Sequence, residues 1–272
     1  MGSVTVLVLV LIGVLTGLTT VLFGFGGGFV TVPVIVWADA ALGSAAGTVA
    51  VATSAIVMVV NAAVATTATP RVVLARLRGR GALLGLLAAG GLVGALAAMA
   101  VPAEVPSWGF LIYVAVTIID VLVRPGFLRP VGLTHDDTSQ RRIPTACGAP
   151  IGAVASFLGV GGSVMTVPLL RRGGLPMGHA AALANPLTLA ISIPAALVFL
   201  LSRHAMAPDG VVFGVGVVDI GAAAFLLMGA IPVIVTLRRR PPRIPDRAHA
   251  WAYVALLVVV LLAMAASLLR EG

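Results

Sequence analysis

The chain has 272 residues, of which 60% are hydrophobic and only 10% are charged, whereas soluble globular domains carry about a quarter charged residues. This composition excludes an ordinary soluble domain and predicts an all-α polytopic membrane protein. The net charge of +8 comes from 17 arginines without a single lysine. Most of these arginines lie in short loops between apolar segments, where they set topology and contact headgroups. We therefore expect membrane lipids, and no nucleic acid, as partners.

The apolar segments follow one another in a repeating order. The first region, 4–37, is interrupted by glycines, and the second interrupted region is 145–170. Each is followed by three continuous apolar segments of about the length that a membrane span needs. These six segments are 44–67, 81–100, 107–123, 180–202, 211–237 and 249–269. The chain therefore divides into two transmembrane repeats, 1–135 and 136–272, within one integral membrane domain.

The interruption itself is a repeated motif. The sequence GFGGGFVTVP, from Gly24 to Pro33, returns as GVGGSVMTVP from Gly159 to Pro168, 135 positions later. Glycine clusters and prolines weaken helices, so we expect each helix to stop at membrane depth. New helices are expected to start at about Phe29 and Val164. Duplicated halves with matching interrupted segments indicate the substrate site of a transporter.

The way in which the interrupted regions enter the membrane decides the topology. If each crosses once, ten arginines lie on one side and seven on the other. If each is a re-entrant hairpin, fifteen lie on one side and only Arg203 and Arg270 on the other, which agrees with the positive-inside rule. This second arrangement predicts an inverted-topology repeat. Each half is then a glycine-broken re-entrant helical hairpin plus three transmembrane helices.

Both chain termini are then expected outside, with residues 40 and 173 on opposite faces. The alternative is an eight-helix bundle with kinked first and fifth helices.

The interrupted helices suggest how a substrate binds. The first N–H groups of a helix have no partner within it, and they carry the positive end of the helix dipole. Two helix starts that face one cavity can bind an anion without a buried lysine or arginine. A second paired element, AVATS from Ala50 and ALANP from Ala182, adds hydrogen-bonding groups 132 positions apart. The predicted substrate-binding residues are Gly26, Gly27, Gly28, Thr31, Thr53, Ser54, Gly161, Gly162, Ser163, Thr166 and Asn185. Close helix packing is the alternative role for these glycines.

Several other residues receive an interpretation. Asp219 lies in the apolar segment 211–237, and an acid inside a membrane span is a candidate for coupling transport to a proton. The sequence His135-Asp136-Asp137 lies in a polar loop and is interpreted as solvated, so no metal ion and no cofactor are expected. Tryptophans and tyrosines favour membrane interfaces. The predicted interfacial anchors are Trp37, Trp108, Trp251, Tyr113 and Tyr253.

The paired Gly-x-Gly-Gly-Gly-x-x-x-Val-Pro motifs, each followed by an Ala-Val-x-Thr-Ser-like element, resemble the TauE/SafE sulfite exporter family, also called the sulfonate-uptake permease family. The resemblance covers essentially the whole chain in length, segment order and spacing. It implies a transporter of small sulfur-containing anions, such as sulfite, sulfonates or sulfoacetate, in the plasma or inner membrane, and not an enzyme. The chain departs from the pattern at Ser163, which replaces a glycine, and at Asn185-Pro186, which replaces Thr-Ser.

We therefore expect a secondary transporter that moves a small anion by alternating access. The alternatives are a passive anion channel with the same filter chemistry and a permease for other small organic anions. An intramembrane enzyme would need a nucleophile with a base, or a metal pair, which the apolar segments do not provide. A non-transporting assembly factor would make the symmetric breaks dispensable. A homo-oligomer is compatible with the sequence, which leaves substrate, direction and coupling ion open.

Overall fold

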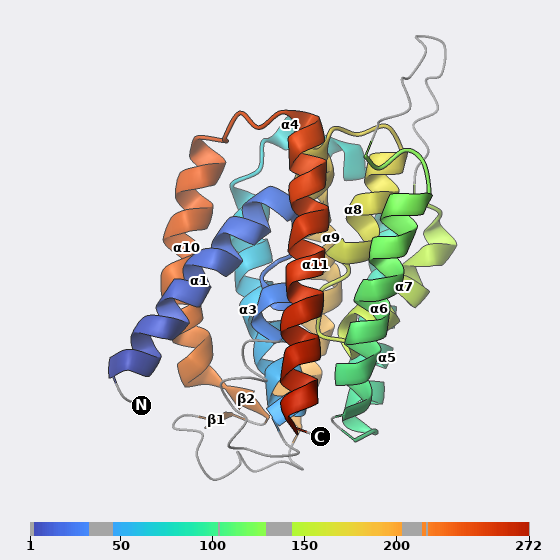
Figure 1. Ribbon diagram of the computed structural model, residues 1–272. Helices are drawn as coiled ribbons and strands as arrows, with labels where there is room; N and C mark the ends of the chain where they lie inside the picture. The colour runs from blue at the N-terminus through green and yellow to red at the C-terminus, as the bar shows by residue number, and fades with distance from the viewer. Residues whose placement is uncertain are drawn as a thin grey trace, which may run out of the picture.

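A computed structural model describes residues 3–32, 46–102, 104–128, 143–202, 214–215 and 217–271. The described chain is almost entirely helical, as the composition predicts (Figure 1). Several sequence predictions fall on residues outside these ranges. They are the boundary between the repeats at 135/136, the polar loop 135–137, Pro33, Trp37, residue 40 and Arg203.

The first repeat begins with α1 (Ser3–Phe23), and residues 28–32 are helical again after a break. The rest of this repeat comprises α3 (Ala46–Thr67), α4 (Arg71–Leu74), the 3-10 helix η2 (Ala75–Leu77), α5 (Gly81–Met99) and α6 (Glu104–Val123). The second repeat comprises η3 (Thr145–Cys147), α7 (Gly148–Phe157), α8 (Ser163–Arg172), α9 (Met177–Leu201), β1 (Gly214–Val215), β2 (Val218–Asp219), α10 (Ile220–Arg239) and α11 (Asp246–Glu271). The strands β1 and β2 pair antiparallel, with Gly214 opposite Asp219.

Seven described helices are long and apolar enough to cross a membrane: α1, α3, α5, α6, α9, α10 and α11. Six of them correspond to the six continuous segments expected from the sequence. The seventh, α1, has 21 residues and reaches a span's length on its own, whereas α7 has only 10. The first arms of the two interrupted regions therefore differ in length.

The helices run between two ends of the bundle, called the upper and lower ends from their place in Figure 1. The start of α1, the start of α3 and the end of α11 lie at the lower end. The helix α7 starts, and α8 ends, towards the upper end. The first interrupted region and α3 thus start at the lower end, whereas the second interrupted region starts, and α8 ends, towards the upper end.

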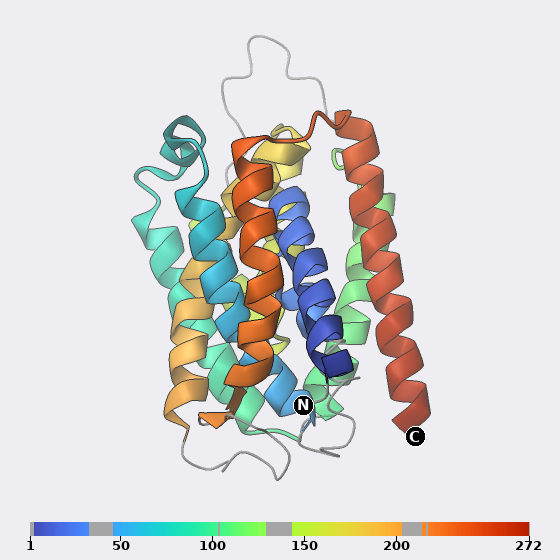
Figure 2. The same cartoon turned by 90° about the vertical axis from the view of Figure 1, so that its left-hand side faces the viewer.

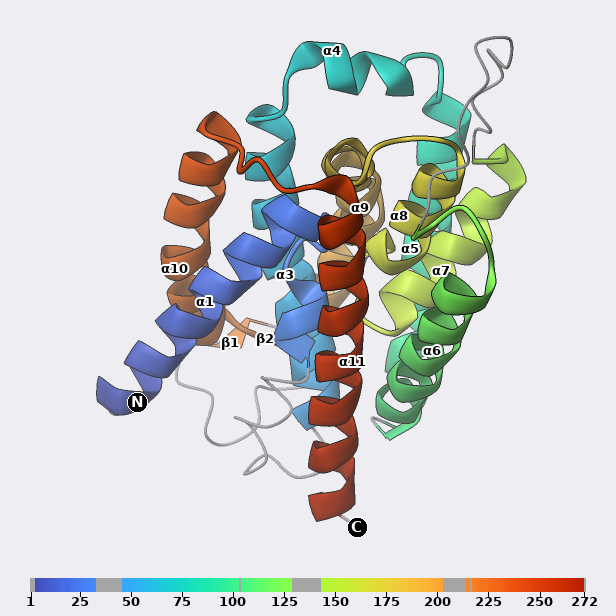
Figure 3. The same cartoon turned by 45° about the horizontal axis from the view of Figure 1, so that its top comes forward.

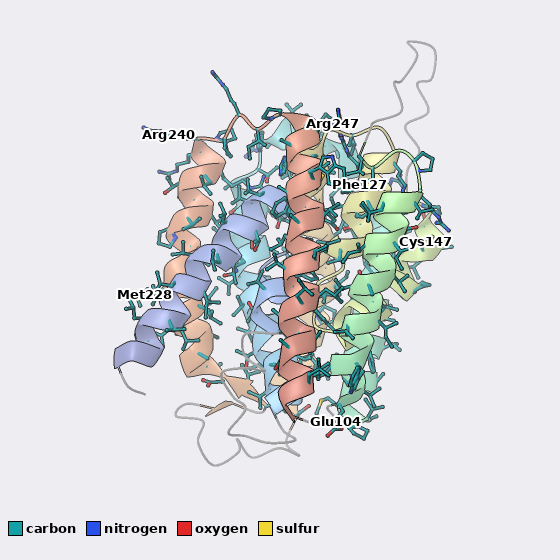
Figure 4. All side chains as sticks on the ribbon, in the orientation of Figure 1. Glu104, Phe127, Cys147, Met228, Arg240 and Arg247 are labelled. Atoms are coloured by element: carbon teal, nitrogen blue, oxygen red, sulfur yellow. The ribbon has the colours of Figure 1, made fainter. Side chains whose placement is uncertain are left out.

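Arginines gather at the upper end, where Arg240 and Arg247 are labelled, while Glu104 lies at the lower end (Figure 4). The short helices α4 and η2, the start of α5, the ends of α8 and α10 and the start of α11 all lie there (Figure 1). The arginines in or beside these segments are Arg71, Arg76, Arg78, Arg80, Arg171, Arg172, Arg238, Arg239, Arg240, Arg243 and Arg247. The last turn of α11, which carries Arg270, lies at the lower end.

The first arms of the two interrupted regions pack across the repeats through glycine. The helix α1 packs on α10, which lies beside α1 and α3 in Figure 2, and α7 packs on α5. A Cβ on Gly13 would lie 2.1 Å from the carbonyl oxygen of Leu226, and a Cβ on Gly90 would lie 2.1 Å from that of Ala149. Such small residues allow helix backbones to approach closely in membranes. Each first arm therefore rests on a span of the opposite repeat.

The aromatic residues show where the interface prediction fails. Trp108 and Trp251 are about half exposed, which suits a lipid-facing position. Tyr253, expected at the interface, is instead fully buried, and its ring contacts Phe23, Phe25 and Phe127. The sequence places it in the second turn of a span, but the structure uses its hydroxyl inside the protein, as described below.

Candidate substrate site at the paired glycine breaks

The two breaks follow the same backbone path. After α1 ends at Phe23, three glycines adopt positive φ, a region that residues with a Cβ rarely enter. After α7 ends at Phe157, three glycines 135 positions later do the same. The pairs are Gly24 and Gly159 (φ 75° and 70°), Gly26 and Gly161 (63° and 73°), and Gly27 and Gly162 (98° and 77°). The repeated motif therefore encodes a repeated backbone geometry.

New helices start directly after the last of these glycines, at residue 28 and at Ser163, one residue earlier than expected. The N–H groups of Thr31 and Thr166 donate to the carbonyl oxygens of Gly27 and Gly162, which closes the first turn. In the described structure, the backbone N–H groups of residues 26–29 and 161–164 donate to no protein acceptor. Each break thus holds unpaired donors at the positive end of a helix dipole.

The two breaks meet between α3 and α9. A Cβ on Gly26 would lie 2.9 Å from Cγ2 of Thr188 and 3.5 Å from Cγ of Met58. A Cβ on Gly161 would lie 2.8 Å and 2.6 Å from Cγ2 of Thr188 and Sδ of Met58. One added to Gly28 would lie 2.7 Å from the carbonyl oxygen of Gly159. Glycine is therefore required because two backbones and two side chains converge here.

Each break also packs on the span that follows the other break. A Cβ on Gly24 would lie 2.4 Å from the carbonyl oxygen of Ala181, and one on Gly159 would lie 3.3 Å from Cα of Val51. The equivalent positions on α3 and α9 are thus 130 apart, not the 132 inferred from the small-residue elements. Asn185 is consequently not the structural counterpart of Thr53. The mismatch arises because runs of alanine, valine and threonine align about equally well in more than one register.

Buried polar atoms without a partner lie along these elements. Both amide atoms of Asn61, Oδ1 of Asn185 and the hydroxyls of Ser163 and Thr166 make no hydrogen bond, and these residues are at most 1% exposed. A buried polar atom without a hydrogen bond costs about 1–3 kcal/mol. Such atoms are expected where a polar ligand completes the bonding.

The two asparagines are the only ones in the chain. Nδ2 of Asn61 lies 2.7 Å from the Cβ position of Gly27. Asn185 follows Ala181 by four residues and precedes Thr188 by three, so it lies on the face of α9 that contacts the breaks. Neither Asn61 nor Thr188 was predicted as a site residue from the sequence. An asparagine within an apolar span was the available signal for Asn61, whereas Thr188 has no polar counterpart in the first repeat.

Two predicted hydroxyls are engaged with the backbone of the breaks. Thr31 donates to the carbonyl oxygen of Gly27 at 2.8 Å. Ser54 is bonded to the carbonyl oxygens of Val51 at 2.8 Å and Gly159 at 3.2 Å, while Thr188 donates to that of Gly161 at 2.6 Å. Ser54 and Thr188 therefore hold the second break in place. These bonds occupy the carbonyl oxygens of Gly159 and Gly161, while the N–H groups of residues 161–164 stay without a protein acceptor in the described part of the chain.

Thr53 and Asp219 lie together at a different place. The backbone N–H of Asp219 donates to Oγ1 of Thr53 at 3.0 Å, and Oδ1 of Asp219 accepts from the N–H of Ala222 at 2.9 Å. Asp219 is thus the N-cap of α10, which starts at Ile220. The prediction that Asp219 lies inside a span is wrong, because the span begins about nine residues later than the apolar segment in the sequence.

One face of α11 fastens both interrupted regions. Nε2 of His249 is 2.7 Å from the carbonyl oxygen of Leu22 at the end of α1, and the hydroxyl of Tyr253 donates to the carbonyl oxygen of Val164 in the first turn of α8 at 3.1 Å. One turn earlier, Asp246 pairs with Arg171 at the end of α8.

The Arg171 side chain is fully buried and also donates to the carbonyl oxygens of Phe127 and Leu175. The charge of Arg171 is therefore paired within the fold and is not available at the breaks.

The comparisons with known proteins agree with the sequence motifs. The family described as "Sulfite exporter TauE/SafE" matches residues 9–264. The match includes both glycine breaks and confirms the resemblance drawn from their motifs. Searches of curated proteins and of solved structures returned no match to this chain.

Proposed function

Because the chain belongs to the TauE/SafE sulfite exporter family of membrane transporters, we propose that it is a secondary transporter of small sulfur-containing anions. The proposed substrates are sulfite, sulfonates and sulfoacetate-like compounds, moved across the cell membrane by alternating access. The observation that carries the proposal is the meeting of two glycine breaks, each with unpaired backbone N–H groups at a helix start. An oxyanion presents several acceptor oxygens, so it can take bonds from both breaks at once.

The unpartnered side chains support an oxyanion as the substrate. The hydroxyls of Ser163 and Thr166 and the amide of Asn61 can donate to oxygen, and they lie buried without partners. Arg171 is bonded elsewhere, so main-chain dipoles supply most of the positive potential. Binding by dipoles and neutral donors suits a carried ion, because the ion must leave again.

The arrangement of the ends supports an inverted-topology repeat. The first interrupted region begins at the lower end and the second at the upper end (Figure 1). Arginines concentrate at the upper end, so the positive-inside rule makes that end cytoplasmic. The protein then lies in the plasma or inner membrane with both termini on the outer side. We treat α1 as the long first arm of a re-entrant hairpin, since α3 starts at the same end as α1.

The contacts between repeats support alternating access. They come in exchanged pairs: α1 on α10 and α7 on α5, then α3 on α10 and α9 on α5. Such pairs are expected from a pseudo-two-fold axis in the membrane plane. Exchange of two nearly equivalent packings then opens the site to one side or to the other. No second function is favoured by a specific contact. Saturation of flux with substrate would separate this mechanism from a passive channel.

The proposal is tested by flux of radiolabelled sulfite into proteoliposomes. Gly161→Leu and Gly27→Leu place a side chain at the meeting point, so we expect loss of transport with normal membrane insertion. The matched control is Gly85→Leu, because nothing lies within 4 Å of a Cβ at Gly85. Transport by both break variants at the level of the control would contradict the site.

A further inference from the structure

A hollow lies at the upper end of the bundle, apart from the glycine breaks. Its volume is about 220 Å³. One wall comes from the segment through η2 to the start of α5, and the other from the loop after α8 and from α9. The lining residues are Ala75, Arg76, Leu77, Arg78, Arg80, Leu83, Ile143, Leu170, Gly173, Leu175, Leu183 and Leu187. None of them belongs to the substrate site proposed above.

Among the residues that the structure describes, no acidic side chain compensates the positive charge of this hollow. Three of its lining residues are arginines, and no acidic residue lines it. Within the described chain, the guanidinium groups of Arg76 and Arg78 make no hydrogen bond and no ion pair. Arg80 donates once, from Nη1 to the carbonyl oxygen of Ile143 at 3.1 Å, which leaves its other N–H groups free. Several unpaired guanidinium donors around one hollow favour an oxyanion, which can accept bidentate hydrogen bonds.

The remaining walls are apolar. Three leucines are buried at the hollow: Leu83 of α5, Leu175 of the loop after α8, and Leu183 of α9. A bare inorganic ion gains nothing from such a surface. A ligand with a charged head and an apolar chain uses both parts, because the chain removes leucine surface from water while the head meets the arginines.

The position of the hollow also suits such a ligand. The α4–η2 segment arches over the upper end of the bundle between α3 and α5 (Figure 3). The exposed arginines of this segment lie beyond the ends of the apolar spans, at the level where lipid headgroups are expected. Basic pockets between membrane helices at that depth bind phosphate-bearing headgroups.

We propose that this hollow is a binding site for an amphiphilic oxyanion, in which Arg76, Arg78 and Arg80 hold a phosphate or sulfonate head and the leucines hold the chain. Two sources can supply this chemistry: an anionic phospholipid of the surrounding leaflet, or a soluble alkyl sulfonate. The site goes beyond the proposed transport function, since it shares no residue with the breaks and binds without any transport step.

The test measures binding to the purified full-length protein by native mass spectrometry. The probes are phosphatidylglycerol and 1-octanesulfonate, each alone and in competition. The double variant Arg76→Gln/Arg78→Gln should weaken binding by about tenfold or more, since each basic residue near a headgroup adds appreciably to affinity. The matched control Arg239→Gln/Arg240→Gln removes the same charge from exposed positions at the same end, and should change binding less than about twofold.

The outcomes separate the sources. If the double variant loses binding of phosphatidylglycerol only, and octanesulfonate does not displace this lipid in the competition experiment, the site binds lipid. If the double variant loses binding of octanesulfonate only, the site binds a soluble amphiphile. If each probe displaces the other, the site accepts both. Equal binding of both probes by the double variant and the control would overturn the proposal, whatever the result of the sulfite flux assay. Arg76→Lys/Arg78→Lys should retain part of the binding, because the charge remains while the bidentate geometry is lost.

Discussion

The two glycine breaks have the same backbone conformation but differ in the helices and side chains around them. Three paired glycines adopt the same positive φ values, and both following helices start with unpaired N–H groups. The first break follows a 21-residue helix and the second a 10-residue helix. The first break has Gly28 and a bonded Thr31, whereas the second has Ser163 and Thr166 with unbonded hydroxyls. What is duplicated is thus the main-chain geometry, and we infer that it supplies the common anion-binding element.

The breaks are also held in different ways. The second is fixed by Tyr253 on Val164, by Ser54 and by the Arg171–Asp246 pair at the end of α8. The described contact that α11 makes with the end of α1 is a single polar one, from His249 to Leu22. The second break therefore resembles a fixed platform, and the first depends more on tight packing against α9.

The largest expected effect comes from Gly24→Ala at the first break, which is compared with Gly159→Ala at the equivalent position of the second break. A Cβ on Gly24 would lie 2.4 Å from a backbone oxygen, whereas one on Gly159 would lie no closer than 3.1 Å, to a side chain. Positive φ costs roughly 1–2 kcal/mol at either site, and overpacking adds roughly 1–3 at Gly24. We expect Gly24→Ala to lower the unfolding free energy by about 4 kcal/mol and Gly159→Ala by about 2.

Thermal unfolding in detergent measures both variants. Gly79→Ala is the control for backbone strain alone, because Gly79 has φ of 75° with nothing within 4 Å of a Cβ. Equal losses of unfolding free energy in Gly24→Ala and Gly159→Ala would contradict the difference in packing between the breaks.

The next effect is on the anchor of the second break. Asp246→Ala leaves the fully buried Arg171 guanidinium without its counter-ion, whose own side chain is 38% exposed, and a buried charge left unpaired costs roughly 3 kcal/mol. Asp246→Asn should cost less, because an amide oxygen can still accept from the backbone N–H of Met177. Unfolding in detergent checks the order. An unchanged midpoint for Asp246→Ala would show that Arg171 is satisfied by its two carbonyl partners alone.

A smaller effect sharpens the difference in side chains. Ser163→Gly gives the second break the residue that the first has at position 28, so the fold should tolerate it. Loss of one donor to an anion costs about 1.4 kcal/mol, which predicts about a tenfold higher KM for sulfite at an unchanged maximal rate. The reciprocal Gly28→Ser should abolish transport, because its Cβ would approach the carbonyl oxygen of Gly159. An unaltered KM in Ser163→Gly would exclude the hydroxyl from the site.

The smallest effect is expected at Asp219. Asparagine caps helices about as well as aspartate, so Asp219→Asn should change the unfolding free energy by less than about 0.5 kcal/mol. Since Oδ1 of Asp219 serves as the cap of α10, we also expect the pH profile of transport to stay unchanged. Loss of pH dependence in this variant would assign the coupling proton to Asp219 instead.

The sequence predicted the elements better than their contacts. Six spans, both breaks and both helix starts follow from apolar length and from glycine, because those signals are local. The register between α3 and α9 did not follow, since the connection after the break is five residues shorter in the second repeat and the aligned residues are too alike. Asn61 and Thr188 were missed because neither has a polar counterpart in the other repeat. The buried position of Tyr253 depends on a carbonyl group of another element, which no local pattern records.

The central claim is that the two breaks enter the membrane from opposite faces and meet. It is tested by labelling single cysteines with an impermeant maleimide in sealed vesicles, in a Cys147→Ala background that removes the only native cysteine. Ser3→Cys and Ala46→Cys flank the first interrupted region, and Gly173→Cys follows the second. We expect Ser3→Cys and Ala46→Cys to be labelled from one side of the membrane and Gly173→Cys from the other. Labelling of Ser3→Cys and Ala46→Cys from opposite sides, or of Ala46→Cys and Gly173→Cys from the same side, would contradict it.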